Sequence, residues 1–524
     1  MKRYRFFSLI ILLCCTSVAC NDFLTEYSHD QAYVQSYSDL DELIIGSGYM
    51  KCTGTHDYTY YSTAKETYYP YVHFMADETE VRNTGTYDYY GEDFLKMFYG
   101  FYTWQKDVDK DHEGTVGWTE NQDWINLYKH INITNIILSQ IDNQTIQTEN
   151  DQQNVNRIKG EAHFLRGAYY FVLANLYGKP YSPTSAKTDL AVPIKLTKNI
   201  EDKVYTRATV EKTYEQVLED LLTAEKHLKG QSRKSVTRAG HTATCLLLSR
   251  VYLYMQNYTE ALKWAKACLE EQGSLTDLND YQGTTFLTQT NPEVVFTMGG
   301  NFVGAGLSVG SGAFTVSNDL MQWYTEDDLR KQVFFDLPKE GVYPYKKASK
   351  KSGSRDISDN FVLRTAEAYL NLAEAAACLG NEYTTEALNA YNTIRERRLA
   401  NYTEDRSLTG KDLVEAIRLE RRLELCFEGH RWFDLRRYMV NELYPQEKTL
   451  TNQFVLFKYD YGIYDYVISL QRTFELPPHD NAWVLPIPQT ELESNYGMPD
   501  NPRNERDSKS VSYTHLRAHE TELH

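Results

Sequence analysis

The sequence predicts a mostly α-helical protein that carries loop-rich insertions and a few short strands. Apolar residues recur at helical spacing through two regions, about 125–275 and about 360–440. The segments at about 51–120 and about 280–345 are instead dense in Tyr, Gly, Thr and Asp, and their periodicity is weak. A chain of 524 residues is long enough to bury a sizeable core.

Residues 1–19 are typical of an export signal. Three basic residues near the start precede a short apolar run, Phe6–Leu13, which is too short to span a bilayer. Small residues then lead to a cysteine in Ser17–Cys20 (SVAC), an arrangement similar to a lipobox. We therefore expect cleavage before Cys20 and lipidation of that residue. Ordinary cleavage of a secreted protein is the alternative.

Helical periodicity then continues through most of the chain. The predicted helical segments are Trp124–Ile141, Val155–Tyr177, Val210–Leu228, His241–Glu270 and Arg364–Arg398. Gly178 and Pro180 end the second segment, as helix-stop residues do. Each of the last two segments contains a turn halfway along, which is typical of tetratricopeptide-type hairpins that must stack to bury their apolar faces. A strand is predicted at Glu293–Met298 between these hairpins.

The most heavily charged helical pattern is Glu420–Arg437 (ERRLELCFEGHRWFDLRR). Glu420, Glu424 and Glu428 follow one another at i, i+4 spacing, and large apolar residues such as Trp432 occupy another face. A helix of this composition is expected to be buried with its charges paired. We expect the arginines of the same stretch to surround the three acids.

Two remaining segments show no helical pattern. Residues 440–480 are Tyr-rich and are predicted to be irregular. Residues 506–524 also lack a core pattern. The end of the chain resembles read-through of a sequencing adapter, and the alternative is a disordered tail; neither carries function.

The charged stretch resembles the ERR-x-E-x-x-F-E-G-x-R-x-x-D-L-x-R segment of the SusD/RagB family. Gly160–Tyr181 is similar to the family's R-A-x-Y-Y-F-x-L-x-x-x-Y-G-x-x-P-Y helix, and Trp483–Glu491 (WVLPIPQTE) is similar to its closing L-P-I-P-x-x-E segment. The resemblance runs from Cys20 to about Asn504. It implies a SusD-like nutrient-binding domain over residues 20–505, built on helical repeats.

The resemblance also implies a function and partners. Family members are surface lipoproteins of the outer membrane of Bacteroidetes-type bacteria. They capture an oligosaccharide and present it to a SusC-like, TonB-dependent transporter. RagB-like members with peptide cargo are one alternative, and a helical-repeat scaffold that binds only protein is another. The net charge of −17 argues against a nucleic-acid partner.

Aromatic residues outside the predicted helices are the candidate ligand-binding residues, because the ligand site of SusD-like proteins is a shallow aromatic surface. Trp104, Trp323 and Tyr324 lack the i, i+3, i+4 neighbours of core aromatics. Their rings could stack on sugar rings, and we expect Trp323 and Tyr324 to lie near solvent. The alternative is that the tryptophans pack the insertions onto the repeats. The polar candidates are Asp77, Glu78, Arg82, Asn83 and Asn301.

We expect no enzymatic activity and no cofactor, and no residue is predicted to ligate a metal ion. Glu424 and Glu428 lie one helical turn apart among arginines, whereas the two carboxyl groups of a glycosidase flank a bond in an open cleft. No CxxC or Cys/His spacing suggests zinc. The cysteines within apolar helical patterns are expected to be small core residues without disulfides; they are Cys245, Cys268, Cys378 and Cys426.

Overall fold

The computed structural model describes residues 34–51, 68–82, 89–115, 117, 121–199, 201–307, 313–338, 342–348 and 357–510. The export signal, Cys20, Asn83 and the end of the chain from residue 511 lie outside the described residues. Most of the described elements are helices and the strands are few, which confirms the predicted fold class. None of the described helices is long and apolar enough to cross a bilayer.

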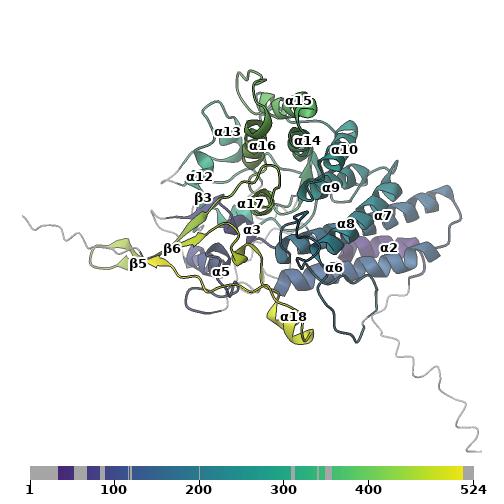
Figure 1. Cartoon of the computed structure of the whole chain (residues 1–524), viewed down its shortest axis with the longest axis horizontal. Helices are drawn as coiled ribbons and strands as arrows, with labels where there is room; N and C mark the ends of the chain where they lie inside the picture. Colours follow the sequence, from purple (N-terminus) through teal and green to yellow (C-terminus); the bar gives the residue numbers. More distant parts are fainter. Residues whose placement is uncertain are drawn as a thin grey trace, which may run out of the picture.

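Long helices packed side by side form the body of the protein (Figure 1). They are α6 (Asn121–Gln140), α7 (Glu149–Tyr177), α8 (Val210–Leu228), α9 (His241–Tyr254), α10 (Tyr258–Glu271), α14 (Thr365–Leu379), α15 (Thr384–Glu396) and α16 (Gly410–Glu424). Consecutive members of α6–α10 contact each other, and α14 packs on α10, α15 and α16. This arrangement is the stack of helical hairpins that the sequence predicts.

Close approach of α7 and α8 depends on a glycine. A Cβ atom on Gly160 would lie 2.6 Å from Cγ of Leu228 on α8, so a larger residue would push the helices apart. The start of α7 is fixed by a capping box, in which the Thr148 hydroxyl accepts from the Asp151 amide and the Asp151 carboxylate accepts from the Thr148 amide. The longest helix is thereby held in register against its neighbour.

The insertions contribute buried residues to the main core, although the sequence predicts loop-rich surface there. Between residues 68 and 102 they form α3 (Val72–Met75), β1 (Thr79–Val81), α4 (Tyr89–Met97) and α5 (Tyr99–Tyr102). The rings of Tyr71 and Phe101 stack at 4.0 Å, and Phe74 packs against Phe94 and Phe314. Buried aromatic contacts of this kind join segments far apart in sequence.

A second insertion packs against the first. It contains α11 (Val303–Gly306), β3 (Phe314–Val316), α12 (Asn318–Met321) and α13 (Arg330–Phe334). Strand β3 pairs antiparallel with β1, with Thr79 opposite Val316. The predicted strand is present as β2 (Val294–Thr297), which pairs with β4 (Val362–Arg364). The β1–β3 pair therefore joins the two insertions.

The charged stretch forms two helices and not one. Helix α16 ends at Glu424, and α17 (Arg431–Met439) begins after a sharp turn. Phe427 and Gly429 both have positive φ angles, of 59° and 76°. At Gly429 a side chain would also collide with the backbone, because a Cβ atom there would lie 2.6 Å from the Asn360 carbonyl oxygen.

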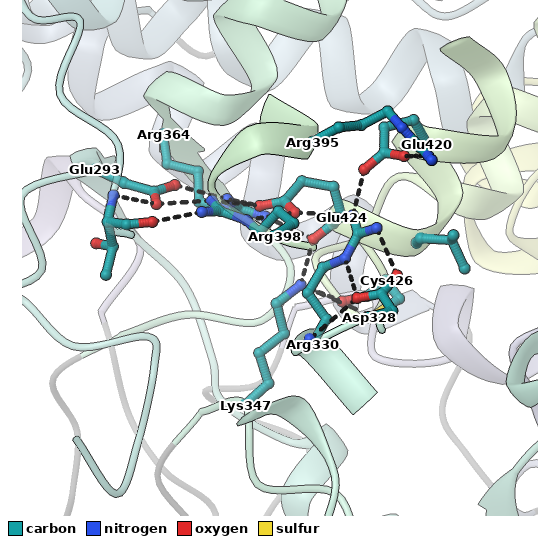
Figure 2. Close-up of polar contacts among 12 residues, drawn as sticks. Glu293, Asp328, Arg330, Lys347, Arg364, Arg395, Arg398, Glu420, Glu424 and Cys426 are labelled. Atoms are coloured by element: carbon teal, nitrogen blue, oxygen red, sulfur yellow. Dashed lines mark hydrogen bonds and ion pairs between the residues drawn. The ribbon is translucent and has the colours of Figure 1, made fainter. Parts of the chain in front are cut away.

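The three acids of this stretch are buried and paired as expected, but their main partners come from elsewhere in the chain. Figure 2 shows these partners for Glu420 and Glu424. The Glu424 carboxylate lies 2.7 Å from Arg364, 2.9 Å from Arg398 and 3.1 Å from Arg330. Glu293, which precedes β2, bridges Arg364 and Arg398 at 2.9 and 2.8 Å. All of these side chains are fully buried, so the network ties α16 to the strand pair β2–β4 and to the end of α15.

Residues 450–476 form a long hairpin, although the sequence predicts irregular structure there. Strands β5 (Leu450–Asp460) and β6 (Asp465–Leu476) pair along their whole length and project from the helical body (Figure 1). A short strand, β7 (Lys509–Ser510), adds to β6. Arg506 donates hydrogen bonds to the Trp104 carbonyl and to Asp480. The described part of the predicted tail therefore packs on the domain.

The end of the described chain closes against the helical body through α18 (Gln489–Ser494), which precedes Asn495. The Asn495 side chain accepts a hydrogen bond from the Tyr205 amide at 2.8 Å.

The thiols of Cys245, Cys268, Cys378 and Cys426 are buried and free. This confirms their prediction as small core residues without disulfides.

Candidate functional site

A groove of about 440 Å³ lies beside Trp323, and we call it the Trp323 groove. Its lining comes from the end of α12, the outer face of α16, helix α17 and the loop before β5. The lining residues are Asp319, Trp323, Glu415, Ala416, Arg418, Leu419, Arg422, Arg431, Tyr438, Gln446 and Lys448. The groove thus combines one large aromatic ring with many charged and amide groups.

Trp323 is exposed because α12 is held rigidly beneath it. The Ser317 hydroxyl accepts from the Leu320 amide at the start of α12 and donates to the Asp77 carbonyl at 2.6 Å. Trp323 follows this short helix in the chain, and 47% of the residue's surface is exposed. Every other tryptophan in the described part of the chain is at most 8% exposed.

Helix α16 presents different residues on its two faces. Glu420 and Glu424 point into the buried ion network (Figure 2). Arg418, Leu419 and Arg422 line the groove on the other face. Because these three residues are spaced by one helical turn or less, they form one continuous stripe.

Below the groove, Asp77 is buried in a cluster of cations. Its carboxylate lies 2.7 Å from Arg431, 2.6 Å from Lys448 and 3.2 Å from Arg422. Burial alone would raise the pKa of the Asp77 carboxyl, but the charges of Arg431 and Arg422 outweigh burial and hold that pKa well below its usual range. Asp319 joins the cluster at 2.6 Å from Arg422 and 2.7 Å from Lys448.

A second hollow, of about 470 Å³, adjoins the first. We call it the β1–β5 hollow, because its lining comes from β1, the start of α12 and the start of β5. Asp319 and Lys448 line both hollows, so this ion pair forms the boundary between them. The other polar side chains of the β1–β5 hollow are Asp77, Thr79, Glu80, Tyr102, Ser317, Asn318, Thr449, Thr451, Asn452 and Gln453.

The structure brings together two of the residues proposed from sequence, Trp323 and Asp77, through Asp319 and Arg422. Asp77 acts there as a buried counter-ion beneath the groove. Asp77 and Asp319 both have pKa values held low by cations, and in each case burial opposes that shift. These two acids therefore stay ionised, a state in which neither donates a proton to a ligand.

Trp104 and Tyr324 do not lie near solvent, so the expectation that they form a stacking surface is wrong. The Trp104 ring is fully buried, and its Nε1 donates to the Met75 carbonyl at 3.0 Å. The Tyr324 hydroxyl is buried and donates to the Leu423 carbonyl at 2.8 Å. Tyr324 thus joins the second insertion to α16, whereas Trp104 is bonded within the first insertion.

The other polar candidates that the structure describes, Glu78, Arg82 and Asn301, do not line the Trp323 groove. Arg82 is buried, and its amide donates to the Ala313 carbonyl at 2.9 Å. Asn301 donates from Nδ2 to the Ile357 carbonyl at 3.1 Å. Burial and the neighbouring Asp77 charge raise the pKa of the buried Glu78 carboxyl to about 7.

Sequence reasoning missed most of the groove. The sequence predicts that Arg422 pairs with the acids of Glu420–Arg437, and Arg418 and Leu419 precede that stretch. Gln446 and Lys448 lie in a loop with no pattern to mark them. Within the described ranges, no group of three or more His, Cys, Asp or Glu side chains is arranged to hold a metal ion.

Comparison with known families gives two matches that together span most of the chain. Residues 281–503 match the model described as "SusD family". Residues 60–253 match the model described as "Starch-binding associating with outer membrane". All residues that line the groove lie in the first of these two regions. Asp77, which lies beneath the groove, belongs to the second region.

Individual relatives are similar over most of their length. The SusD-like protein P2 of Formosa agariphila is 25% identical, in a match covering 67% of this chain and 75% of that protein. A SusD superfamily protein of Bacteroides thetaiotaomicron has a similar structure, with a TM-score of 0.66, 22% identity and coverage of 89% of this chain and all of the other. A SusD-like carbohydrate binding protein of Bacteroides vulgatus gives a TM-score of 0.63 at 19% identity, with coverage of 88% and 97%. The two structural likenesses establish the fold.

Proposed function

Because the chain belongs to the SusD family, we propose that it binds a carbohydrate without transforming it and that the Trp323 groove is the binding site. The observation that carries this proposal is the exposed indole of Trp323 on the wall of a 440 Å³ groove. A sugar ring presents C–H groups on its faces, and these pack on an aromatic plane.

Polar groups around the indole supply the hydrogen bonds that hydroxyl groups of a sugar require. Gln446 offers an amide, and Lys448 offers an ammonium group that also reaches the β1–β5 hollow. Asn318 and Asn452 also line that second hollow, where their amide nitrogens already donate to Glu80 and to the Tyr102 carbonyl. An oligosaccharide lying across the Asp319–Lys448 pair would place successive sugar units in the two hollows.

The ion cluster below the groove supports binding by holding these groups in place. Asp77 bonds to Arg431 from α17, to Arg422 from α16 and to Lys448 from the loop before β5. Three separate segments therefore share one buried carboxylate. A site whose side chains are already fixed loses less conformational entropy when it binds ligand.

We further infer that the protein is anchored to the outer membrane through Cys20 and passes its carbohydrate to a SusC-like, TonB-dependent transporter. The motivation is the signal-like segment that ends at Cys20, together with the family membership. Both statements stay predictions, because Cys20 lies outside the described residues and no transporter is present.

Calorimetric titration of a glycan panel tests the proposal, with wild type compared to Trp323→Ala. Loss of a stacking ring should weaken binding by about 1–3 kcal/mol, which is roughly 5- to 150-fold in affinity, without lowering the melting temperature. Tyr496→Ala is the matched control, because Tyr496 is also an exposed aromatic residue and does not line the groove.

Two results would reject the proposal. Unchanged glycan affinity in a folded Trp323→Ala variant would remove the groove from the site. Binding of wild type to peptides and to no glycan in the panel would instead favour the RagB-like alternative.

A further inference from the structure

The Trp323 groove has a charge balance opposite to that of the whole chain. Its lining contains four cationic side chains and two carboxylates, whereas the chain has a net charge of −17. The lining cations are Arg418, Arg422, Arg431 and Lys448, and the carboxylates are Asp319 and Glu415. Local clustering of one sign of charge attracts ligands of the other sign.

Ion pairing beneath the groove does not cancel this excess. Arg422, Arg431 and Lys448 share only the carboxylates of Asp77 and Asp319, at distances of 2.6–3.2 Å. In this cluster three positive charges therefore face two negative ones. The adjacent Glu78 does not restore the balance below neutral pH, because burial, reinforced by the Asp77 charge, raises its pKa to about 7.

A second cluster, which includes Arg418 from the groove lining, also has more positive than negative charges. Three arginines there share two carboxylates at distances of 2.6–3.1 Å. The members are Arg418, Arg421, Arg437, Glu374 and Asp434. The nearest further carboxylate, Glu367, is 3.9 Å from Arg421 and is already paired with Arg250 at 2.6 Å. This cluster also carries one positive charge more than negative charges.

Hydrogen bonding shows the same imbalance. Among the described residues, Nη2 of Arg418 and Nε of Arg422 have no acceptor, and both residues line the groove. Glu415, the acid on the outer wall, lies 3.5 Å from the Lys411 ammonium group, so a cation of its own accompanies it. The two N–H groups without acceptors are buried, so they add to the unbalanced positive charge beneath the groove and do not contact a ligand directly.

We propose that the Trp323 groove selects anionic saccharides, in which a carboxylate or sulfate group lies against Lys448 while the indole of Trp323 packs on the sugar ring. This inference rests on the proposed function and narrows its ligand class. Lys448 is the cation that a ligand reaches most readily, since its side chain is 35% exposed, whereas those of Arg422 and Arg431 are 5% and 11% exposed.

Asp319 competes with the anionic group of the ligand. Its carboxylate already accepts from Lys448 at 2.7 Å and from Arg422 at 2.6 Å, and its side chain is 44% exposed. A ligand carboxylate at the mouth of the groove displaces this partly hydrated carboxylate from Lys448. Removal of the Asp319 charge should therefore strengthen the binding of anionic sugars, and removal of the Lys448 charge should weaken it.

Calorimetric titration with matched ligand pairs tests the inference. The probes are oligogalacturonates with their fully methyl-esterified forms, and sulfated galactan oligosaccharides with their desulfated forms. A neutral glucan and a neutral xylan series complete the panel. We expect wild type to bind an acidic member about tenfold more tightly than its neutral partner at about 50 mM salt, and this preference should shrink at about 500 mM salt.

The two variants should act in opposite directions. Lys448→Met should abolish most of the acidic preference, and Asp319→Asn should increase it, with melting curves showing that both proteins are folded. Binding confined to neutral glycans, or equal affinity for both members of a pair, would overturn the inference and leave the proposed function standing. An absence of binding to all members of the panel would overturn both.

Discussion

Glu428→Gln is the substitution that tests most sharply whether buried ion pairs hold this fold together. The Glu428 carboxylate accepts two hydrogen bonds from Arg364, both at 2.8 Å, and lies 2.5 Å from the Lys347 ammonium group. All three side chains are fully buried. Gln has the same size and shape as Glu, so the substitution removes the charge without opening a cavity.

The expected loss is about 3–5 kcal/mol of unfolding free energy. Two unit charges about 4 Å apart attract by about 4 kcal/mol at an effective dielectric constant of about 20. The variant leaves Lys347 and part of the charge of Arg364 buried without a counter-ion, and breaking one side of a buried pair costs about 3–5 kcal/mol. Glu424 and Glu293 still contact Arg364, so the fold should survive.

Glu404→Gln is the matched control. Glu404 also pairs with an arginine, Arg406, at 2.9 Å, but both side chains are exposed. Exposed pairs of this kind contribute little to stability. Urea unfolding followed by circular dichroism compares the variants without screening the charges. Equal unfolding midpoints for the two variants would refute the claim that the network stabilises the fold.

Two further predictions concern pH and location. Burial, with the charge of Asp77 adding to it, raises the pKa of Glu78 from 4.5 to about 7, so the folded protein binds this proton more tightly than the unfolded chain, and its stability falls as the pH rises from about 4.5 to about 7. Glu78→Gln should therefore gain up to about 3 kcal/mol relative to wild type between pH 5 and pH 8 in urea unfolding, and an equal difference at both pH values would contradict this cause. Cys20→Ala should leave the mature protein in the soluble fraction of cells, and a variant that still sediments with outer membranes after a high-salt wash would disprove lipid anchoring.

The long helices were predictable because each one buries a continuous apolar face. The predicted segment Val210–Leu228 coincides with α8, and the turn predicted at Gln256 separates α9 from α10. The break between α16 and α17 was harder to see, because both helices keep their periodicity on either side of it. Its local signal is Gly429, a residue that readily adopts a positive φ angle.

The β5–β6 hairpin escaped prediction because its tip faces solvent on both sides. Tyr461 and Tyr464 in the turn are exposed. The adjacent strand residues Tyr459 and Tyr466 are exposed too, so no alternation between buried and exposed residues marks the strands there. Alternation is present nearer the base, where Leu450, Asn452 and Phe454 are buried and the residues between them are exposed. Tyr-rich composition alone therefore did not distinguish a projecting hairpin from an irregular loop.

The candidate site was only partly predictable, since long-range packing decides which aromatic residues are exposed. Trp104 and Trp323 look alike in sequence, because each has one large apolar residue three positions earlier, Phe101 or Leu320, and charged residues soon after it. Trp104 is nevertheless buried against Met75, whereas Trp323 follows a helix pinned at the surface by Ser317. The cations of the groove converge from α16, α17 and a loop, and no local pattern records that convergence.

Acrylamide quenching of tryptophan fluorescence tests the central claim most directly, because Trp323 is the exposed indole of the described chain. The measurement compares wild type with Trp323→Phe, with and without saturating oligosaccharide. If the groove is the binding site, the ligand protects wild-type fluorescence from quenching, and this protection disappears in Trp323→Phe. Ligand binding that leaves the quenching of wild type unchanged would contradict the claim that carbohydrate packs on Trp323.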